Sequence, residues 1–322
     1  MNWGFVTAMK IRGFMGHFRS AAHLSGLVLP RFSRIFAGVR IMRETILSLL
    51  LCLLFLSPVL AAAQLLPIID LHFHFAKGFD IDAFVKQMDT LGVAKVGNGA
   101  RGAPDALALD WARRYPDRFI PFAGKEAMWG FIQSDGERAW RLQAPAVVAY
   151  LQKLEAALRA GQFKGIGEIN NDADPDFPAD SPLMQRLWSL SAAYRVPFNV
   201  HMDAREERVA EMERLLASDR RGTWLWAHAG SAGPALVRRL LRAHPNLWVE
   251  LSGRAFDIMG DAEWKVLLEE FSDRFVLGTD TPNLQQFVLK IGQWRQVLKQ
   301  LSPGTASKVA HQNAERLLNP GR

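Results

Sequence analysis

Short apolar runs alternate with amphipathic stretches along the chain, from about residue 66 to residue 318. The apolar runs are six to ten residues long and rich in β-branched and aromatic side chains, which is typical of buried strands. In the intervening stretches apolar residues recur with helical spacing, and several stretches end at a glycine or a proline. The predicted strands are 66–75, 93–98, 118–125, 163–169, 196–202, 223–230, 247–253 and 274–280, and the predicted helices are 81–92, 104–116, 144–161, 181–195, 206–217, 233–245, 262–271, 284–301 and 308–318.

Eight strands that alternate with helices over about 255 residues predict a single-domain (β/α)8 TIM barrel, a fold of roughly 250 residues. A doubly wound open sheet is the alternative. It would need a glycine-rich phosphate-binding turn after the first strand, and residues 72–80 do not supply one. We interpret residues 126–145 as a long loop after the third strand, lying over the active face of the barrel.

The segment before the barrel has the pattern of a cleavable signal peptide. Residues 42–63 combine a short charged start, an apolar run at 46–56 and small residues at the end, which predicts cleavage after Ala63. The apolar run is too short to span a bilayer comfortably, so an uncleaved anchor is the weaker alternative. The mature domain is then 64–322, and its predicted location is periplasmic or secreted.

Residues 1–41 lie upstream of this signal and carry most of the charge. They hold six basic residues and no acidic one, and thus supply +6 of the formal net charge of +7. Translation from Met42 would make them a mis-assigned extension, and a disordered basic extension is the alternative. The mature domain is nearly neutral, which argues against nucleic-acid binding because the phosphate backbone requires a field of cations.

His72 and His74 lie near the end of the first predicted strand, in the sequence Asp70-Leu-His-Phe-His. Because strand residues alternate between faces, both imidazoles project to the same side. A buried imidazole needs a polar partner, and its neutral nitrogen is also a common ligand of Zn²⁺. Taken alone, the two residues fit either a metal site or a pair of hydrogen-bonded core histidines.

Further ionisable residues stand at the ends of later predicted strands. Glu168 ends the fourth strand, His201 the fifth, His228 the sixth and Asp280 the eighth. Each has an ordinary structural interpretation, as a salt-bridged, capping or core side chain. In a barrel, however, the carboxyl ends of all strands open on one face, so these side chains should converge on one cavity. Imidazole and carboxylate groups together suit Zn²⁺ and similar divalent ions, and we therefore predict a metal centre.

The chain resembles the amidohydrolase superfamily, and in particular its amidohydrolase-related branch, over residues 66–320. The resemblance rests on Asp70-x-His72-x-His74, ARRYPDRFIPFA at 112–123, GIGEI around Glu168, Val200-His201, AHAG at 227–230, LGTDTP at 277–282 and NAERLL at 313–318. It implies a metal-dependent barrel hydrolase. The resemblance also implies that His72, His74, His201 and Asp280 hold the metal.

The chain departs from many two-metal relatives at the end of strand four. They carry a carbamylated lysine there, whereas this chain has Glu168. Glutamate bridges metals in other branches of the superfamily, so Glu168 and His228 leave room for a second, weaker metal site. We expect one Zn²⁺ ion, with Mn²⁺ or another divalent metal as the alternative.

The predicted reaction uses the metal to lower the pKa of a bound water and to polarise a substrate carbonyl. Asp280 would act as general base, and His228 would hydrogen-bond the developing oxyanion or the water. Lys125 at the end of strand three and Arg254 beyond strand seven suit a substrate carboxylate or phosphate, and Trp129 is a candidate substrate contact. A solvated surface charge is the ordinary alternative for each cation.

Hydrolysis of a lactone, ester or amide bond in a small molecule is the activity we predict first. Branch relatives also decarboxylate or hydrate unsaturated carboxylic acids with the same ligand set, which is the main alternative. A TatD-like nuclease and an inactive metal-binding protein rank below both. We expect a small-molecule substrate and no membrane partner after cleavage, while Trp111 and Trp264 look exposed and leave room for a homodimer.

Overall fold

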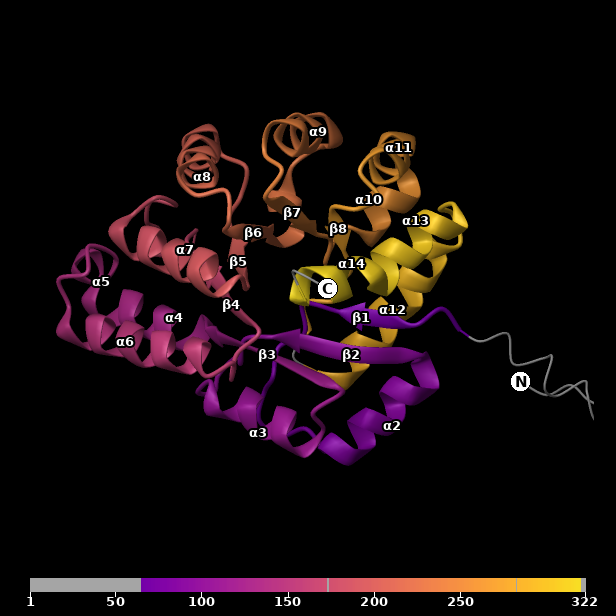
Figure 1. Cartoon of the computed structure of the whole chain (residues 1–322). Helices are drawn as coiled ribbons and strands as arrows, with labels where there is room; N and C mark the ends of the chain where they lie inside the picture. The colour runs from indigo at the N-terminus through magenta and orange to yellow at the C-terminus, as the bar shows by residue number, and fades with distance from the viewer. Residues whose placement is uncertain (1–64, 173, 282, 320–322) are drawn as a thin grey trace, which may run out of the picture. The chain divides into compact units, whose positions relative to one another are not determined.

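The computed structural model describes residues 65–172, 174–281 and 283–319, and the predicted signal peptide and N-terminal extension lie outside them. Eight parallel strands pair in sequence order and curve into a nearly closed barrel (Figure 1). The last strand meets the first where Leu71 N donates to Leu277 O at 2.9 Å and where Phe73 bridges Thr281. The strands are β1 (Ile68–Asp70), β2 (Val93–Asn98), β3 (Phe119–Gly124), β4 (Gly165–Asn170), β5 (Pro197–His201), β6 (Thr223–Trp226), β7 (Leu247–Glu250) and β8 (Phe275–Val276).

Helices surround the strands, as the (β/α)8 prediction requires (Figure 1). Their apolar faces pack on the barrel because each carries buried residues at helical spacing, such as Phe84, Val85 and Met88 on α2. The α-helices are α2 (Ile81–Leu91), α3 (Ala106–Arg114), α4 (Lys125–Asp135), α5 (Glu137–Trp140), α6 (Pro145–Arg159), α7 (Pro182–Tyr194), α8 (Glu206–Ser218), α9 (Pro234–Ala243), α10 (Ala255–Gly260), α11 (Ala262–Glu270), α12 (Leu284–Leu298), α13 (Pro303–Ser307) and α14 (Asn313–Leu318). Two tighter or wider turns, the 3₁₀ segment η1 (Ala227–Ser231) and the π segment η2 (Lys308–Gln312), interrupt this series.

The prediction of a long loop at 126–145 is wrong, because most of this segment forms α4 and α5. Gly124 takes a left-handed conformation, with φ of 102°, and turns the chain from β3 directly into α4. Met128 and Ile132, four residues apart, are the buried residues of this helix. The segment thus does stand next to the end of β3, but as a helix.

Several strands end earlier than predicted. β1 stops at Asp70, and the residues up to Phe75 make only isolated bridges, from Phe73 to Thr281 and from Phe75 to Ala100. His228 lies beyond β6 in η1, in a left-handed conformation with φ of 57°. His72, His74 and His228 therefore lie on segments just beyond the paired part of β1 and β6, and the regular strand geometry does not fix their backbone there.

The two tryptophans predicted to be exposed are buried. Trp111 and Trp264 are each 2% exposed. The Trp111 ring packs edge-on against Phe75 and Phe119, with centroid distances of 5.3 and 5.2 Å, and the Arg254 guanidinium lies over Trp264. Amphipathic spacing put both residues on helices but did not fix which face meets the barrel. They therefore offer no surface for a homodimer.

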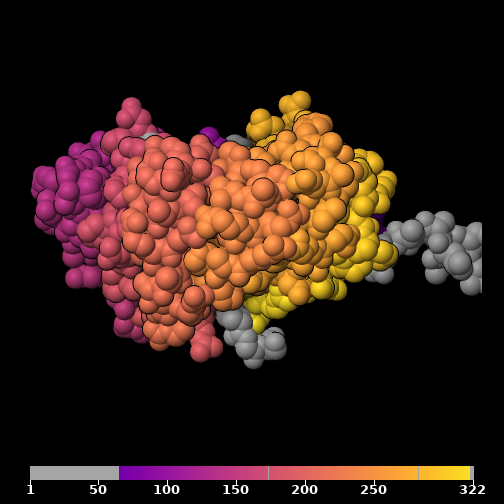
Figure 2. Space-filling model, turned by 90° about the horizontal axis from the view of Figure 1, so that it is seen from above, coloured from indigo at the N-terminus to yellow at the C-terminus, as the bar shows by residue number. Residues whose placement is uncertain are grey.

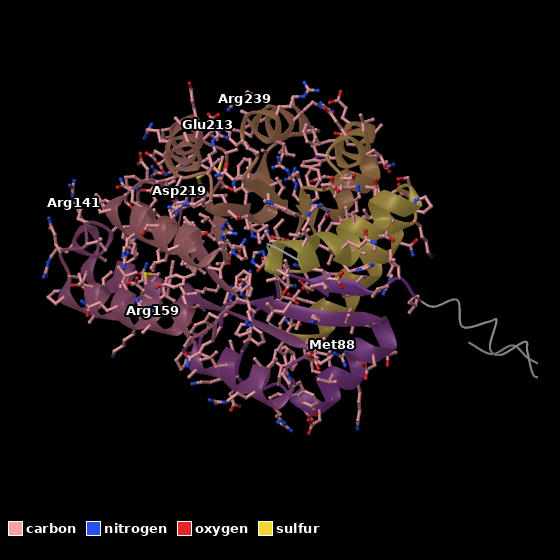
Figure 3. All side chains as sticks on the ribbon, in the orientation of Figure 1. Met88, Arg141, Arg159, Glu213, Asp219 and Arg239 are labelled. Atoms are coloured by element: carbon pink, nitrogen blue, oxygen red, sulfur yellow. The ribbon has the colours of Figure 1, made fainter. Side chains whose placement is uncertain are left out.

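The outer side of the domain carries charged residues, several of them in exposed ion pairs. Helices α8, α9 and α11 form a continuous surface over one side of the barrel (Figures 1 and 2). On it, Arg239 of α9 and Glu213 of α8 form an exposed ion pair at 2.8 Å (Figure 3). Among the described residues, no helix is both long and apolar enough to cross a membrane.

Candidate metal centre

His72 and His74 are both completely buried, on the segment that follows β1. A contact at Nδ1 fixes each ring. Nδ1 of His74 lies 3.1 Å from the carbonyl oxygen of Gly99, and Nδ1 of His72 lies 2.6 Å from Glu250 Oε2. A carbonyl and a carboxylate accept hydrogen bonds, so each Nδ1 carries the proton in the neutral ring. The lone pair of each imidazole is then on Nε2, the atom that a metal would bind.

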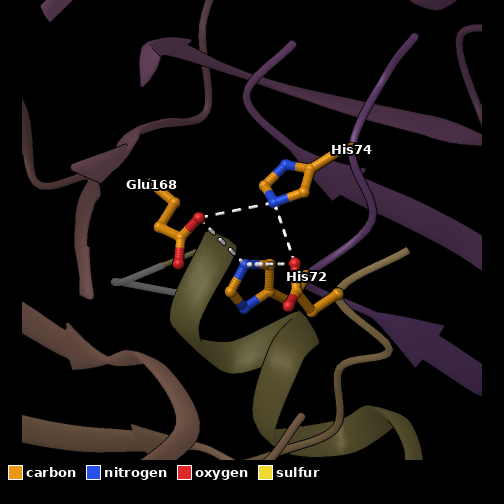
Figure 4. A group of neighbouring side chains, drawn as sticks. His72, His74 and Glu168 are labelled. Carbon is orange, nitrogen blue, oxygen red and sulfur yellow. Dashed lines mark ion pairs between the residues drawn. The ribbon is translucent and has the colours of Figure 1, made fainter. Parts of the chain in front are cut away.

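The two Nε2 atoms have no hydrogen-bond partner among the described residues, although both are buried. Two carboxylates face them. Glu168 Oε2 lies 3.4 Å from each Nε2 (Figure 4). Asp280 Oδ1 lies 3.1 Å from Nε2 of His74 and 3.7 Å from Nε2 of His72. The four donor atoms lie within 4.8 Å of one another. Because buried unpaired nitrogen atoms are costly, this donor set fits a divalent metal ion.

A second group of donors shares Glu168. Its other oxygen, Oε1, lies 3.0 Å from His201 Nδ1 and 3.4 Å from His228 Nε2. His228 Nδ1 lies 3.2 Å from the carbonyl oxygen of Ser252, which places its proton on Nδ1 in the neutral form. The sequence predicted His201 together with His72, His74 and Asp280. The structure groups Glu168 with His72, His74 and Asp280, and it places His201 in the second group.

Glu168 carries the charge that holds these groups together. It comes from β4, is 3% exposed, and receives the Lys125 ammonium on Oε2 at 2.6 Å. Burial acts to raise the pKa of this carboxyl, but Lys125 and His72 hold it well below its usual range. The carboxylate is therefore ionised in spite of its burial.

Sequence reasoning missed the buried acids behind the histidines. Glu250, at the end of β7, is completely buried and accepts from Ser252 Oγ at 2.8 Å in addition to its contact with His72. Asp70 accepts from Thr279 Oγ1 at 2.6 Å, and burial raises its pKa to about 6 despite these hydrogen bonds. The signal for Glu250 was present, since a lone carboxylate follows the apolar run LWV in a predicted strand.

A cavity of about 500 Å³ opens beside the donor groups. Its polar lining includes Glu168, His201 and Asp280, together with Lys125. Its other lining residues are Arg101, Gly102, Glu126, Met128, Trp129, Ile132, Ile169, Asn170 and Phe177. Lys125 and Trp129, two of the three predicted substrate contacts outside the donor groups, thus border this cavity, and α4 carries both of them.

Arg254, the other predicted cation, does not border the cavity. Its guanidinium donates to the carbonyl oxygen of Ala232 at 2.7 Å, pairs with Asp257 at 3.1 Å and lies over the Trp264 ring. These contacts occupy it within the outer helices, so the geometry gives no support for a role in substrate binding. Arg101 borders the cavity instead, three residues beyond β2. Extending the search for cations to the end of strand two would have found it.

Comparison with known proteins identifies related chains. The family model described as amidohydrolase matches residues 69–319. None of the curated proteins compared with the chain matches it. Among solved structures, an uncharacterized TIM-barrel protein from Bordetella bronchiseptica is similar at 17% identity and a TM-score of 0.57, with 79% of this chain and 98% of that chain covered.

Two further similar structures are of named enzymes. One is a dihydroxybenzoic acid decarboxylase from Polaromonas sp. JS666 with bound manganese and the inhibitor 2-nitroresorcinol, at 15% identity and a TM-score of 0.55, covering 80% of this chain and 98% of that chain. The other is 4-oxalomesaconate hydratase from Rhodopseudomonas palustris, at 14% identity and a TM-score of 0.55, covering 78% and 95%. These likenesses show the fold. The family model covers more than half of the chain, and this protein therefore belongs to the amidohydrolase family.

Proposed function

We propose that this protein is a metal-dependent lyase that decarboxylates or hydrates a small unsaturated carboxylic acid. One observation carries the proposal: the same cavity is bordered by Asp280 and Glu168 of the first donor group and by the Arg101 cation. Two similar structures, the manganese-containing decarboxylase and the hydratase, support this activity over the hydrolysis predicted first from the sequence.

The residues that would hold the metal are His72, His74, Glu168 and Asp280, because their donor atoms already face one another. When bound, the ion supplies a Lewis acid that polarises a substrate oxygen and lowers the pKa of water. Imidazole and carboxylate ligands suit both Zn²⁺ and Mn²⁺. The manganese in the similar decarboxylase makes Mn²⁺ as good a candidate as the Zn²⁺ expected from the sequence.

Asp280 is the proton-transfer group that we propose. Its side chain is 32% exposed and borders the cavity, whereas the other carboxylate of the donor group, Glu168, is 4% exposed. Burial acts to raise the pKa of Asp280, but His74 and His72 lower it below its usual value, so it is ionised at neutral pH. In decarboxylation it would relay a solvent proton to the carbon that loses CO₂. In hydration it would accept a proton from the water whose oxygen adds to one carbon of the double bond and then return that proton to the other carbon.

The remaining residues bind and orient. Arg101 would pair with the substrate carboxylate, for which its planar guanidinium is suited. Met128, Trp129 and Phe177 provide an apolar wall for the carbon skeleton. His228, with its proton on Nδ1 in the neutral form, carries a lone pair on Nε2 and would use it to orient a water molecule near Glu168.

Hydrolysis of a lactone, ester or amide is the second candidate. The ionised Asp280 of the first donor group also suits the activation of water for attack on a carbonyl. The two reactions use the same residues and differ in the bond that breaks. An assay of both products therefore separates them.

The test is a substrate panel with the protein loaded with Mn²⁺ or Zn²⁺. We expect CO₂ release from hydroxybenzoates, or loss of the double-bond absorbance of unsaturated dicarboxylates, and no opening of lactones. Asp280→Asn should lower kcat at least about 100-fold, since a positioned acid or base contributes 10²–10⁴ in rate. Lactone opening without CO₂ release or hydration would establish the hydrolase instead. Near-normal turnover in Asp280→Asn would remove this residue from the mechanism.

A further inference from the structure

Lys125 makes the shortest contact that the structure shows to Glu168. Its Nζ lies 2.6 Å from Oε2, the same oxygen that lies 3.4 Å from the Nε2 atoms of His72 and His74. The Lys125 side chain is 16% exposed and that of Glu168 is 4% exposed. An ion pair this well shielded from water is screened less than one on the surface.

The surrounding backbone fixes Lys125 in this place. Lys125 is the first residue of α4, and the amide of the preceding Gly124 donates to both carboxylate oxygens of Asp105, at 3.1 and 3.2 Å. A Cβ at Gly99 would lie 2.7 Å from Lys125 Cβ and 2.3 Å from the carbonyl oxygen of Gly167. The absence of a side chain at Gly99 thus leaves the space that the lysine stem passes through. Backbone and packing together direct the ammonium to Glu168.

Glu168 is also the carboxylate that two of the three donor groups share, the third being His72, His228 and Glu250. The first group adds a second carboxylate, Asp280, whereas the second group adds only the imidazoles of His201 and His228. An ion in the second group would therefore depend on Glu168 for all its negative charge. That charge already faces the first group and is paired with the Lys125 ammonium. A second divalent ion at Glu168 would be repelled by the Lys125 ammonium on the same carboxylate, and this repulsion is strong because the pair is poorly exposed to solvent.

We propose that the Lys125 ammonium takes the place of a second metal ion at Glu168, so that the centre binds one divalent ion. Lys125 is then a positioning residue that holds Glu168 toward the histidine pair. This inference rests on the metal-binding part of the proposed function. It also assigns to Lys125 a role different from the substrate contact expected from the sequence.

The test is metal stoichiometry, which does not depend on turnover. Wild type, Lys125→Met and Lys125→Arg are incubated with excess Mn²⁺, exchanged into metal-free buffer and analysed by native mass spectrometry. Electron paramagnetic resonance on the same samples detects coupling between neighbouring Mn²⁺ ions. Arg101→Met is the matched control, because it removes a cation from the same cavity that forms no ion pair with a described carboxylate.

We expect about one bound Mn²⁺ per chain in wild type, Lys125→Arg and Arg101→Met, and a second, spin-coupled ion in Lys125→Met. Two ions in wild type would overturn the inference, and so would one ion in folded Lys125→Met. If Lys125→Met does not fold, Lys125→Gln serves in its place, with folding checked by circular dichroism. No bound metal in any variant would refute both the inference and the metal-dependent function. One ion throughout, with lyase turnover intact, would refute the inference alone.

Discussion

Among single residues, Glu168 has the largest influence on how the centre is organised. Its Oε2 contacts Lys125 and faces the first donor group, and its Oε1 faces His201 and His228. This buried carboxylate remains ionised mainly because the Lys125 ammonium pairs with it at 2.6 Å. Removing its charge should therefore affect the whole centre and not only one contact.

We expect Glu168→Gln to weaken Mn²⁺ binding more than His201→Ala does. Glu168 belongs to the group with both unpaired histidine nitrogens, whereas His201 approaches only its other oxygen. The loss in Glu168→Gln should be about 100-fold or more, since even supporting residues of metal sites contribute about 10- to 100-fold in affinity. Titration calorimetry measures both, with the exposed Glu207→Gln as a matched control. The opposite order would return His201 to the ligand set in place of Glu168.

Among the secondary-structure elements, α4 contributes several of the residues that line the cavity. It follows β3 without a loop and carries Lys125, Met128 and Trp129 to the cavity wall. Its start is anchored by Asp105, which accepts from the amide of Gly124 and from the hydroxyl of Tyr150 on α6. The position of three cavity residues thus depends on one partly buried carboxyl group.

Asp105 should give stability a distinct pH dependence. Burial raises the pKa of this carboxyl in the folded chain. The folded state then binds the proton more tightly than the unfolded state, so the contribution to stability is present below the unfolded pKa of about 3.9 and is lost as pH rises through the folded pKa. Relative to Asp105→Asn, which cannot titrate, the wild type should therefore lose stability as pH increases from about 4 toward neutral.

Urea unfolding of wild type and Asp105→Asn across this pH range measures the difference in the free energy of unfolding. The exposed Asp117→Asn provides the control for the loss of one carboxylate at the surface. The raised pKa of Asp105 would be contradicted if the difference in the free energy of unfolding between wild type and Asp105→Asn stayed constant with pH. It would also be contradicted if the wild type became relatively more stable as pH rises.

For the whole molecule, most of the formal charge lies outside the barrel. Residues 1–41 supply +6 of the formal charge of +7, so the barrel itself is close to neutral. We propose that the protein is exported and that the barrel meets its substrate outside the cytoplasm. His72 then lies close to the N-terminus of the mature chain, since cleavage after Ala63 leaves only eight residues before it.

N-terminal sequencing of the natively expressed protein should find a mature start near Gln64, because the small residues up to Ala63 match a signal-peptidase site. The protein should also fractionate with periplasmic or secreted proteins. The chain shortened to 64–322 serves as a reference, with a thermal unfolding midpoint equal to that of the exported protein. Recovery of an intact segment 1–41 in the natural protein would refute the proposal.

The sequence by itself determined the barrel and a pool of candidate residues for the centre. Strand and helix periods are local properties, so eight repeats could be recognised, and the carboxyl ends of the strands then pointed to six candidates: His72, His74, Glu168, His201, His228 and Asp280. The sequence put His201 in the first ligand set, where the structure has Glu168. In a parallel barrel the carboxyl ends of all strands lie on one face, and this does not depend on how individual side chains pack. The confirmed fold and family follow from this local information.

Only the tertiary structure decided which atom meets which. Lys125 and Glu168 are 43 residues apart, and His72 and Glu250 are 178 apart, so no periodicity relates them. Their pairing depends on the curvature of the barrel and on α4, which begins at Lys125 directly after Gly124 and runs through the start of the segment 126–145 that the sequence predicted as a loop. The same packing turned Arg254 toward Trp264 and away from the cavity. Long-range contacts of this kind are set by how the elements pack, and they determine that one carboxylate is shared between two donor groups and a lysine.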